Sequence, residues 1–136
     1  MSARNDLAAL IAIDAPESWA IYPYPVNLGP FEDPAKSVAL VVEQTSIASG
    51  VTSSDGERIP VEAELHAWIV VDGSRGDQPD VLEARLEEAL EHMIRALNVL
   101  PDHVWDGRAE RAKFDQSKPA YRVTVKAPGH ITEETS

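Results

Sequence analysis

Three side chains with the chemistry of metal ligands stand at two-residue spacing in this sequence: Glu62, Glu64 and His66. Because side chains alternate between the two faces of a strand, all three share one face. Carboxylate oxygens and an imidazole nitrogen placed in this way could meet a metal ion. A solvated strand face produces the same spacing, however, and no second cluster supplies further ligands. We therefore expect no metal and no other cofactor, and a small metal-dependent enzyme or ligand-binding domain is the weaker alternative.

Other signatures of catalysis are missing from the sequence. It contains no glycine-rich phosphate loop, no GxSxG and no HExxH. The remaining histidines are scattered, and His92 is predicted to lie on the surface of a helix beside Glu91. Without cysteine the chain can form neither a disulfide framework nor a thiolate metal site. We predict no catalytic residues and expect that the protein is not an enzyme.

The candidate ligands belong to the clearest strand pattern in the chain, residues 61–71, where apolar and polar residues alternate. Residues 37–49 form a second strand pattern, and its first half is apolar on both faces, as in a covered central strand. The polar linker between them contains Asp55-Gly56, a turn signal. Together these segments predict a long antiparallel hairpin. Trp68 lies on the polar face of its strand, which hints that part of this face contacts a partner or the N-terminal helix, while core packing is the default for tryptophan.

The longest element that the sequence predicts is a helix over residues 79–100. Its apolar residues recur every three or four positions and line one helical face, so the helix must pack against a sheet or another helix. Pro79 suits the first turn, Asp80 complements the helix dipole, and Pro101 ends the helix. The opposite, charged face carries Glu83, Glu87, Glu88, Glu91 and Arg95.

The rest of the chain predicts shorter elements on either side of this helix. These are a short helix over 2–13, a strand over 18–24 that Pro23 either confines to a sheet edge or makes leave the sheet, a strand from His103 to Lys113 with a turn at Asp106-Gly107, and a strand over 118–127. The order α-β-β-β-α-β-β predicts an α+β fold, in which one long amphipathic helix packs on one face of a mixed or mainly antiparallel sheet. We expect a single domain over 1–127 and a mobile polar tail over 128–136.

Charge narrows the choice of partners. The net charge is −11, which argues against a protein that grips nucleic acid through phosphate contacts. Residues 1–100 hold 6 basic and 17 acidic residues, whereas residues 101–136 hold 6 of each. An acidic body next to a locally basic strand pair could steer copies of the molecule together or to a partner. No export signal or membrane span is predicted near the N-terminus, so we expect a soluble protein.

Four stretches, in this order and in so small a chain, resemble the tail terminator proteins of long-tailed (siphovirus-type) bacteriophages. The stretches are WAIYPYPVNLGP, SVALVV, VEAELHAWIVVDG and a helix of the DVLEARLEEALEHMIRAL kind. The resemblance spans roughly Leu7 to Ala127 and depends on pattern and order, not on a diagnostic motif.

The resemblance implies a structural virion protein of the tail and neck, made in the cytoplasm of the host bacterium. Members of the family close into a homohexameric ring on the tail tube, stop its polymerisation and join the tail to the head connector or stopper. Its partners would be further copies of itself, the tail tube protein and the connector, with DNA passing through the lumen without specific binding. No membrane is involved. A head–tail connector, a stopper or another neck protein is the alternative.

A ring requires a heterologous interface, in which two different surfaces of the same subunit meet. We predict that the acidic face of the long helix meets the basic strand pair of the next subunit, and that the long polar loops dock onto partners. The predicted interface residues are Glu83, Glu87, Glu91, Arg108, Arg111, Lys113, Arg122 and Lys126. The predicted docking-loop residues are Asn27, Phe31, Val51, Asp55 and Arg58.

Overall fold

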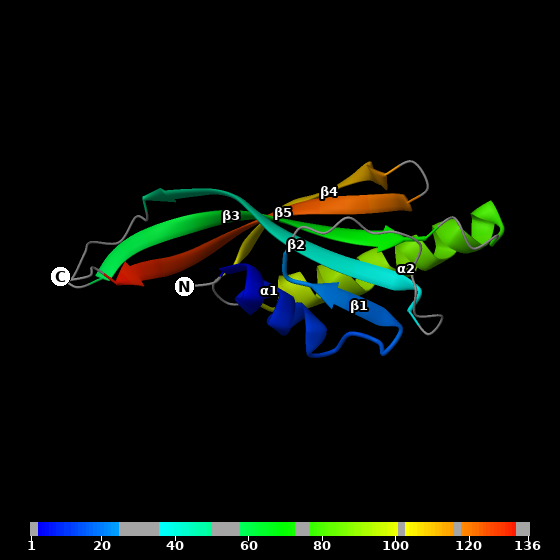
Figure 1. The fold of residues 1–136 in the computed structure, drawn as a ribbon, viewed down its shortest axis with the longest axis horizontal. Helices are drawn as coiled ribbons and strands as arrows, with labels where there is room; N and C mark the ends of the chain where they lie inside the picture. Colours follow the sequence, from blue (N-terminus) through cyan, green and yellow to red (C-terminus); the bar gives the residue numbers. More distant parts are fainter. Residues whose placement is uncertain are drawn as a thin grey trace.

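The computed structural model describes residues 3–24, 36–49, 58–72, 77–100, 103–115 and 118–132, which form a five-stranded mixed sheet and two helices (Figure 1). The predicted α+β class and element order are confirmed. In chain order the elements are α1 (Ala3–Ala12), β1 (Trp19–Tyr22), β2 (Val38–Ser49), β3 (Arg58–Val71), α2 (Pro79–Asn98), β4 (Val104–Asp115) and β5 (Lys118–Thr132).

The strands lie in the order β1-β2-β3-β5-β4, and every pair is antiparallel except β1 with β2. β2 and β3 form the predicted long hairpin, in a register that pairs Val38 with Val71 at one end and Ser49 with Val61 at the other. β1 lies at an edge and ends at Tyr22, immediately before Pro23, in agreement with the two outcomes predicted for a strand that meets a proline.

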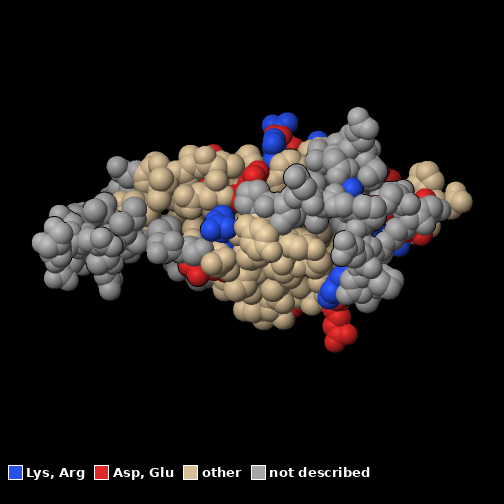
Figure 2. All heavy atoms as spheres, viewed as in Figure 1, with Lys and Arg blue, Asp and Glu red and all other residues tan. Residues whose placement is uncertain are grey.

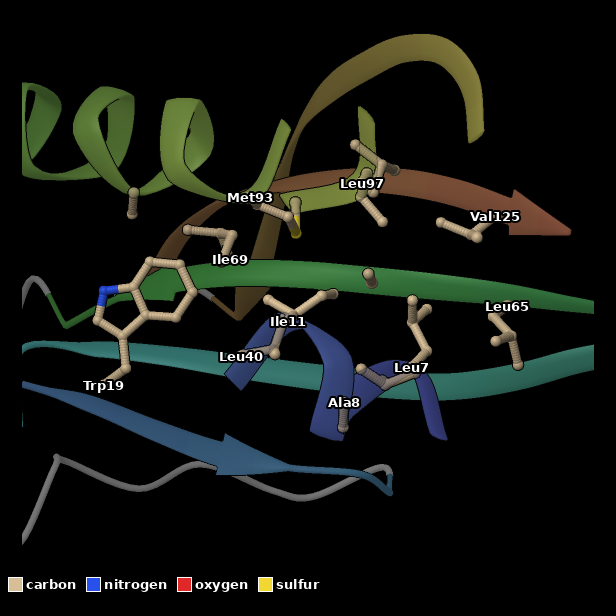
Figure 3. Close-up of a cluster of buried hydrophobic side chains, with 14 of the residues drawn as sticks. Leu7, Ala8, Ile11, Trp19, Leu40, Leu65, Ile69, Met93, Leu97 and Val125 are labelled. Atoms are coloured by element: carbon tan, nitrogen blue, oxygen red, sulfur yellow. The ribbon is translucent and has the colours of Figure 1, made fainter. Parts of the chain in front are cut away.

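Both helices pack on the same face of the sheet, which we call the helix face. Leu7 and Ile11 of α1 and Met93 and Leu97 of α2 are buried against alternate residues of the central strands (Figure 3). The intervening residues of each strand point to the opposite face of the sheet, which we call the open face. Trp68 lies on that open face, so the predicted contact between its face and the N-terminal helix is wrong.

α2 begins at Pro79, as predicted, and its buried residues recur at the expected helical spacing. It ends at Asn98 rather than at Leu100, because Val99 already caps it with an N–H bond to the carbonyl oxygen of Leu97. The predicted turn at Asp106-Gly107 is also wrong. β4 runs through this dipeptide, and the extra residues form an irregularity between Trp105 and Ala109 in which Gly107 adopts φ +77°.

β5 continues beyond the predicted end of its strand. It reaches Thr132, and its last residues pair with Arg58–Glu62 of β3. The mobile tail predicted from residue 128 is therefore wrong for 128–132, while residues 133–136 lie outside the described part of the chain.

This extension completes a three-stranded arm, made of residues 44–49 of β2, 58–64 of β3 and 126–132 of β5. Figure 1 shows it on the left, reaching past both helices. In the register, β1 pairs only with Val38–Val41 of β2, and β4 pairs with β5 no further than Lys126. Among the described strands, the arm therefore has no neighbour along either edge beyond the Val104–Lys126 pair.

Candidate interaction surface

The predicted basic strand pair does not form one surface, because its residues alternate between the two faces of the sheet. Arg111 pairs with Tyr121, whose ring packs on the core under the helices, so Arg111 lies on the helix face. Glu110 and Arg122 pair on the open face, beside Trp68. On the face drawn in Figure 2, the coloured Lys and Arg atoms lie in small groups next to Asp and Glu atoms.

Arg111 contacts the acidic helix face within a single subunit. Its Nη1 donates to Oε2 of Glu83 at 2.8 Å and its Nη2 to Oε1, a bidentate pair of the kind that guanidinium and carboxylate geometries favour. The guanidinium also lies 5.5 Å from the centre of the Tyr121 ring. The pKa of the Glu83 carboxyl is lowered, chiefly by the hydrogen bond from Arg111, and the pKa of Arg111 is raised in return. Two predicted interface residues thus hold α2 against β4.

A polar and aromatic row crosses four strands on the open face. Arg122 Nη2 donates to Oε2 of Glu110 at 2.9 Å, and its guanidinium lies 5.5 Å from the centre of the Trp68 ring. The indole Nε1 of Trp68 donates to Oε1 of Glu43 at 3.1 Å. His66 Nδ1 lies 3.5 Å from the same carboxylate oxygen. Each contact joins side chains of neighbouring strands, so together these contacts stabilise the pairing of the strands from β2 to β4.

The other predicted interface residues are more exposed. The Arg108 side chain, 77% exposed, lies beside Glu110, with 3.8 Å between its Nε and Oε1. Lys126 is exposed and pairs in register with Glu64. On α2, Glu87 is exposed, and Glu91 lies 3.7 Å from Arg95 one turn further on. These side chains are therefore exposed in the single subunit, and their contact with a neighbouring subunit stays a prediction.

Several predicted residues fall outside what the structure describes. Asn27, Phe31, Val51 and Asp55 lie outside the described residues altogether. The backbone of Arg58 begins β3 and that of Lys113 belongs to β4, but their side chains lie outside the description.

The candidate metal ligands Glu62, Glu64 and His66 do share one strand face, but two of them contact other side chains. His66 faces Glu43, and Oε2 of Glu64 lies 3.2 Å from the Thr45 hydroxyl. Within the described part of the chain, no group of three or more His, Asp or Glu side chains is placed to hold a metal ion.

The structure also forms a groove that the sequence did not predict. About 550 Å³ in volume, it lies between α2 and the start of β1. His92, predicted to be a surface residue, is half-buried there, edge-on to Trp19 with 5.0 Å between the ring centres. Its Nε2 is buried and has no hydrogen-bond partner among the described residues. No local signal could have shown this contact, because the two rings are 73 positions apart. Charged residues of both signs line the rim, including Arg85, Glu88, Glu91 and Arg95.

None of the described helices is both long and apolar enough to cross a membrane. In comparisons with known proteins, no family model matches this chain and no curated protein is significantly similar to it.

Proposed function

We propose that this chain is a structural virion protein, a tail terminator that forms a homohexameric ring. The ring caps the tail tube, stops its polymerisation and joins the tail to the head connector. The proposal starts from the family that the sequence resembles. The observation that carries it further is the arm of residues 44–49, 58–64 and 126–132. It extends past both helices, and beyond the Val104–Lys126 pair it has no neighbouring strand among the described ones.

An arm of this kind supports assembly because one subunit then offers two unlike surfaces. The arm lies at one end of the sheet, while the body carries β4 at the opposite edge. Contacts between unlike surfaces are heterologous, and they generate rings when the rotation between subunits closes. An isologous contact would instead stop at a dimer.

The charge supports a lumen through which DNA slides. The chain carries a net charge of −11. An acidic surface repels phosphates, so DNA would pass without adhering.

The proposed function is tested by adding the purified protein to assembled tail tubes and imaging their ends. A terminator binds the tube ends as a ring and prevents further growth when more tube protein is added. A neck protein of the alternative kind binds isolated connector rings and leaves the tube ends bare. Tubes that keep growing in the presence of excess protein would contradict the terminator function.

A further inference from the structure

The free strand edges of this sheet differ in how well they are protected against pairing with another chain. The outer edge of β1 is four residues long and is followed by Pro23. The outer edge of β5 beyond Lys126 contains Pro128. Proline and short length are devices by which proteins prevent pairing at sheet edges. The outer edge of β2 over residues 42–49 contains no proline, and residues 44–49 carry no charge.

The prolines of the arm show which backbone groups point outward. Pro60 pairs with His130, and Pro128 pairs with Glu62. Because proline has no N–H, both must be non-hydrogen-bonded pairs of the β3–β5 ladder. The backbone groups of Glu62 therefore point toward β2, and those of Pro128 point to the free edge of β5.

The same alternation shows which backbone N–H and C=O groups of β2 point toward β3 and which point to its free edge. Since Glu62 points toward β2, its partner Ala48 bonds to β3, whereas Ile47, opposite Ala63, directs its N–H and C=O away from β3. Thr45 is an extra residue in the pairing of β2 with β3, so the alternation shifts by one position there. Before Thr45, the residues whose backbone groups point away from β3 are therefore even-numbered. Beyond the end of the β1–β2 ladder, the outward donors and acceptors of this edge belong to Gln44, Ile47 and Ser49. The side chain of Ile47 is itself 47% exposed.

β4 offers the complementary edge. It is the strand at the far side of the sheet, twelve residues long and without proline. Pro119 pairs with Lys113, so this pair too is non-hydrogen-bonded, and Ala109, Arg111 and Lys113 direct their backbone groups outward. Two arginines next to this edge are already paired within the subunit, in the Arg111–Glu83 and Arg122–Glu110 pairs. A strand could therefore dock there without leaving these charges uncompensated.

We infer that the edge of β2 over residues 44–49 pairs with the outer edge of β4 in a second copy of this chain, so that one sheet continues from subunit to subunit. The inference depends on the proposed ring and names its interface. The occupant is a second copy because that copy presents a twelve-residue edge without proline, unlike that of β2, as a head-to-tail contact requires. Main-chain hydrogen bonds between the two edges would supply the affinity, as in other cases of strand addition.

Proline substitutions at outward positions test the pairing. Ile47→Pro and Ala109→Pro each remove one outward N–H but no hydrogen bond of the subunit's own ladders. Circular dichroism and thermal unfolding should show both variants folded. Each should weaken assembly by about tenfold or more, measured by native mass spectrometry, because the edge loses hydrogen bonds and cannot fit the ring of proline. Ile47→Ala, which keeps the N–H, is the matched control and should assemble like the wild type.

Mixing the two variants tests directly whether the β2 edge of one subunit pairs with the β4 edge of another. An Ile47→Pro subunit keeps a normal β4 edge, and an Ala109→Pro subunit keeps a normal β2 edge. An equimolar mixture should therefore form heterodimers that neither variant forms alone and that grow no further, since the second interface is blocked on both sides. If Ala109→Pro assembled alone like the wild type, or if the mixture stayed monomeric, the inference would be wrong.

The outcomes separate this inference from the proposed function. Rings that persist in Ile47→Pro would overturn the edge pairing and leave the terminator function standing. Open filaments of the wild type that Ile47→Pro abolishes would support the edge pairing and contradict the terminator. If the wild type assembles only on tail tubes, the same variants are scored by their capping of tube ends. A wild type that neither assembles nor caps tubes would contradict both proposals.

Discussion

At the scale of single residues, the Arg111–Glu83 pair makes stability depend on pH. Arg111 lowers the pKa of Glu83 below its ordinary value of 4.5. A carboxyl whose pKa is lower in the folded state stabilises the fold above its unfolded pKa, and this contribution is lost as the pH falls through the folded pKa. We therefore expect Glu83→Gln to lower the melting temperature at pH 7 and to have a smaller effect as the pH falls below 4.5.

The matched control for this prediction is Glu87→Gln, an exposed change on the same helix one turn further on. Thermal unfolding of both variants and the wild type from pH 7 to pH 3 provides the measurement. A Glu83→Gln effect that stays constant over this range would show that the carboxylate charge plays no part in it.

The row on the open face gives a second prediction for single residues. Trp68→Phe keeps an aromatic ring under Arg122 but removes the N–H that donates to Glu43. Because a hydrogen bond between partly buried side chains contributes about 1 kcal/mol, the free energy of unfolding should fall by about that amount. Urea denaturation measures the change. A variant as stable as the wild type would show that the hydrogen bond contributes nothing net.

The sequence identified Glu83 and Arg111 as residues that form contacts, but it did not show that they pair with each other. It placed Glu83 and Arg111 on surfaces that meet between subunits, whereas the structure joins them within one subunit. Charge and spacing identify which face a residue occupies, but the choice of partner depends on how α2 crosses β4. The same reason explains why the burial of His92 against Trp19 was missed.

At the scale of elements, the core depends on α2 packing across the sheet. Met93 is fully buried there, and Met93→Ala should destabilise the protein by about 2–5 kcal/mol, because a cavity remains where the side chain was. Val99, at the end of the same helix, is 75% exposed, and Val99→Ala should change stability by less than about 0.5 kcal/mol. Chemical denaturation of the two variants checks the contrast, and equal effects would contradict this account of the core.

The elements themselves were largely predictable, since hydrophobic period separates strands from helices. Residues 61–71 alternate with period two, and α2 repeats every three or four residues. The errors occurred where long-range pairing overrides local signals. Pro128 and Gly129 predicted the end of a strand, yet β5 continues because β3 supplies a partner and because Pro128 stands where no ladder bond is needed. Gly107 predicted a turn and instead occupies an irregularity within β4.

At the scale of the whole molecule, the sequence predicted the α+β class but not the order of the strands. That order depends on contacts between residues distant in the chain, such as Val61 with Gly129. The arm and its free edges follow from this order, so the surface now inferred for assembly could not be found from the predicted helix and strand charges alone.

The most direct test of the account is the native mass of the purified protein by light scattering, with negative-stain images of the same sample and of the sample mixed with tail tubes. We expect a closed ring with a central hole and a mass six times the 14.8 kDa of one chain, in solution or at the tube ends. A monomer that leaves tube ends bare, or an isologous dimer, would contradict the account.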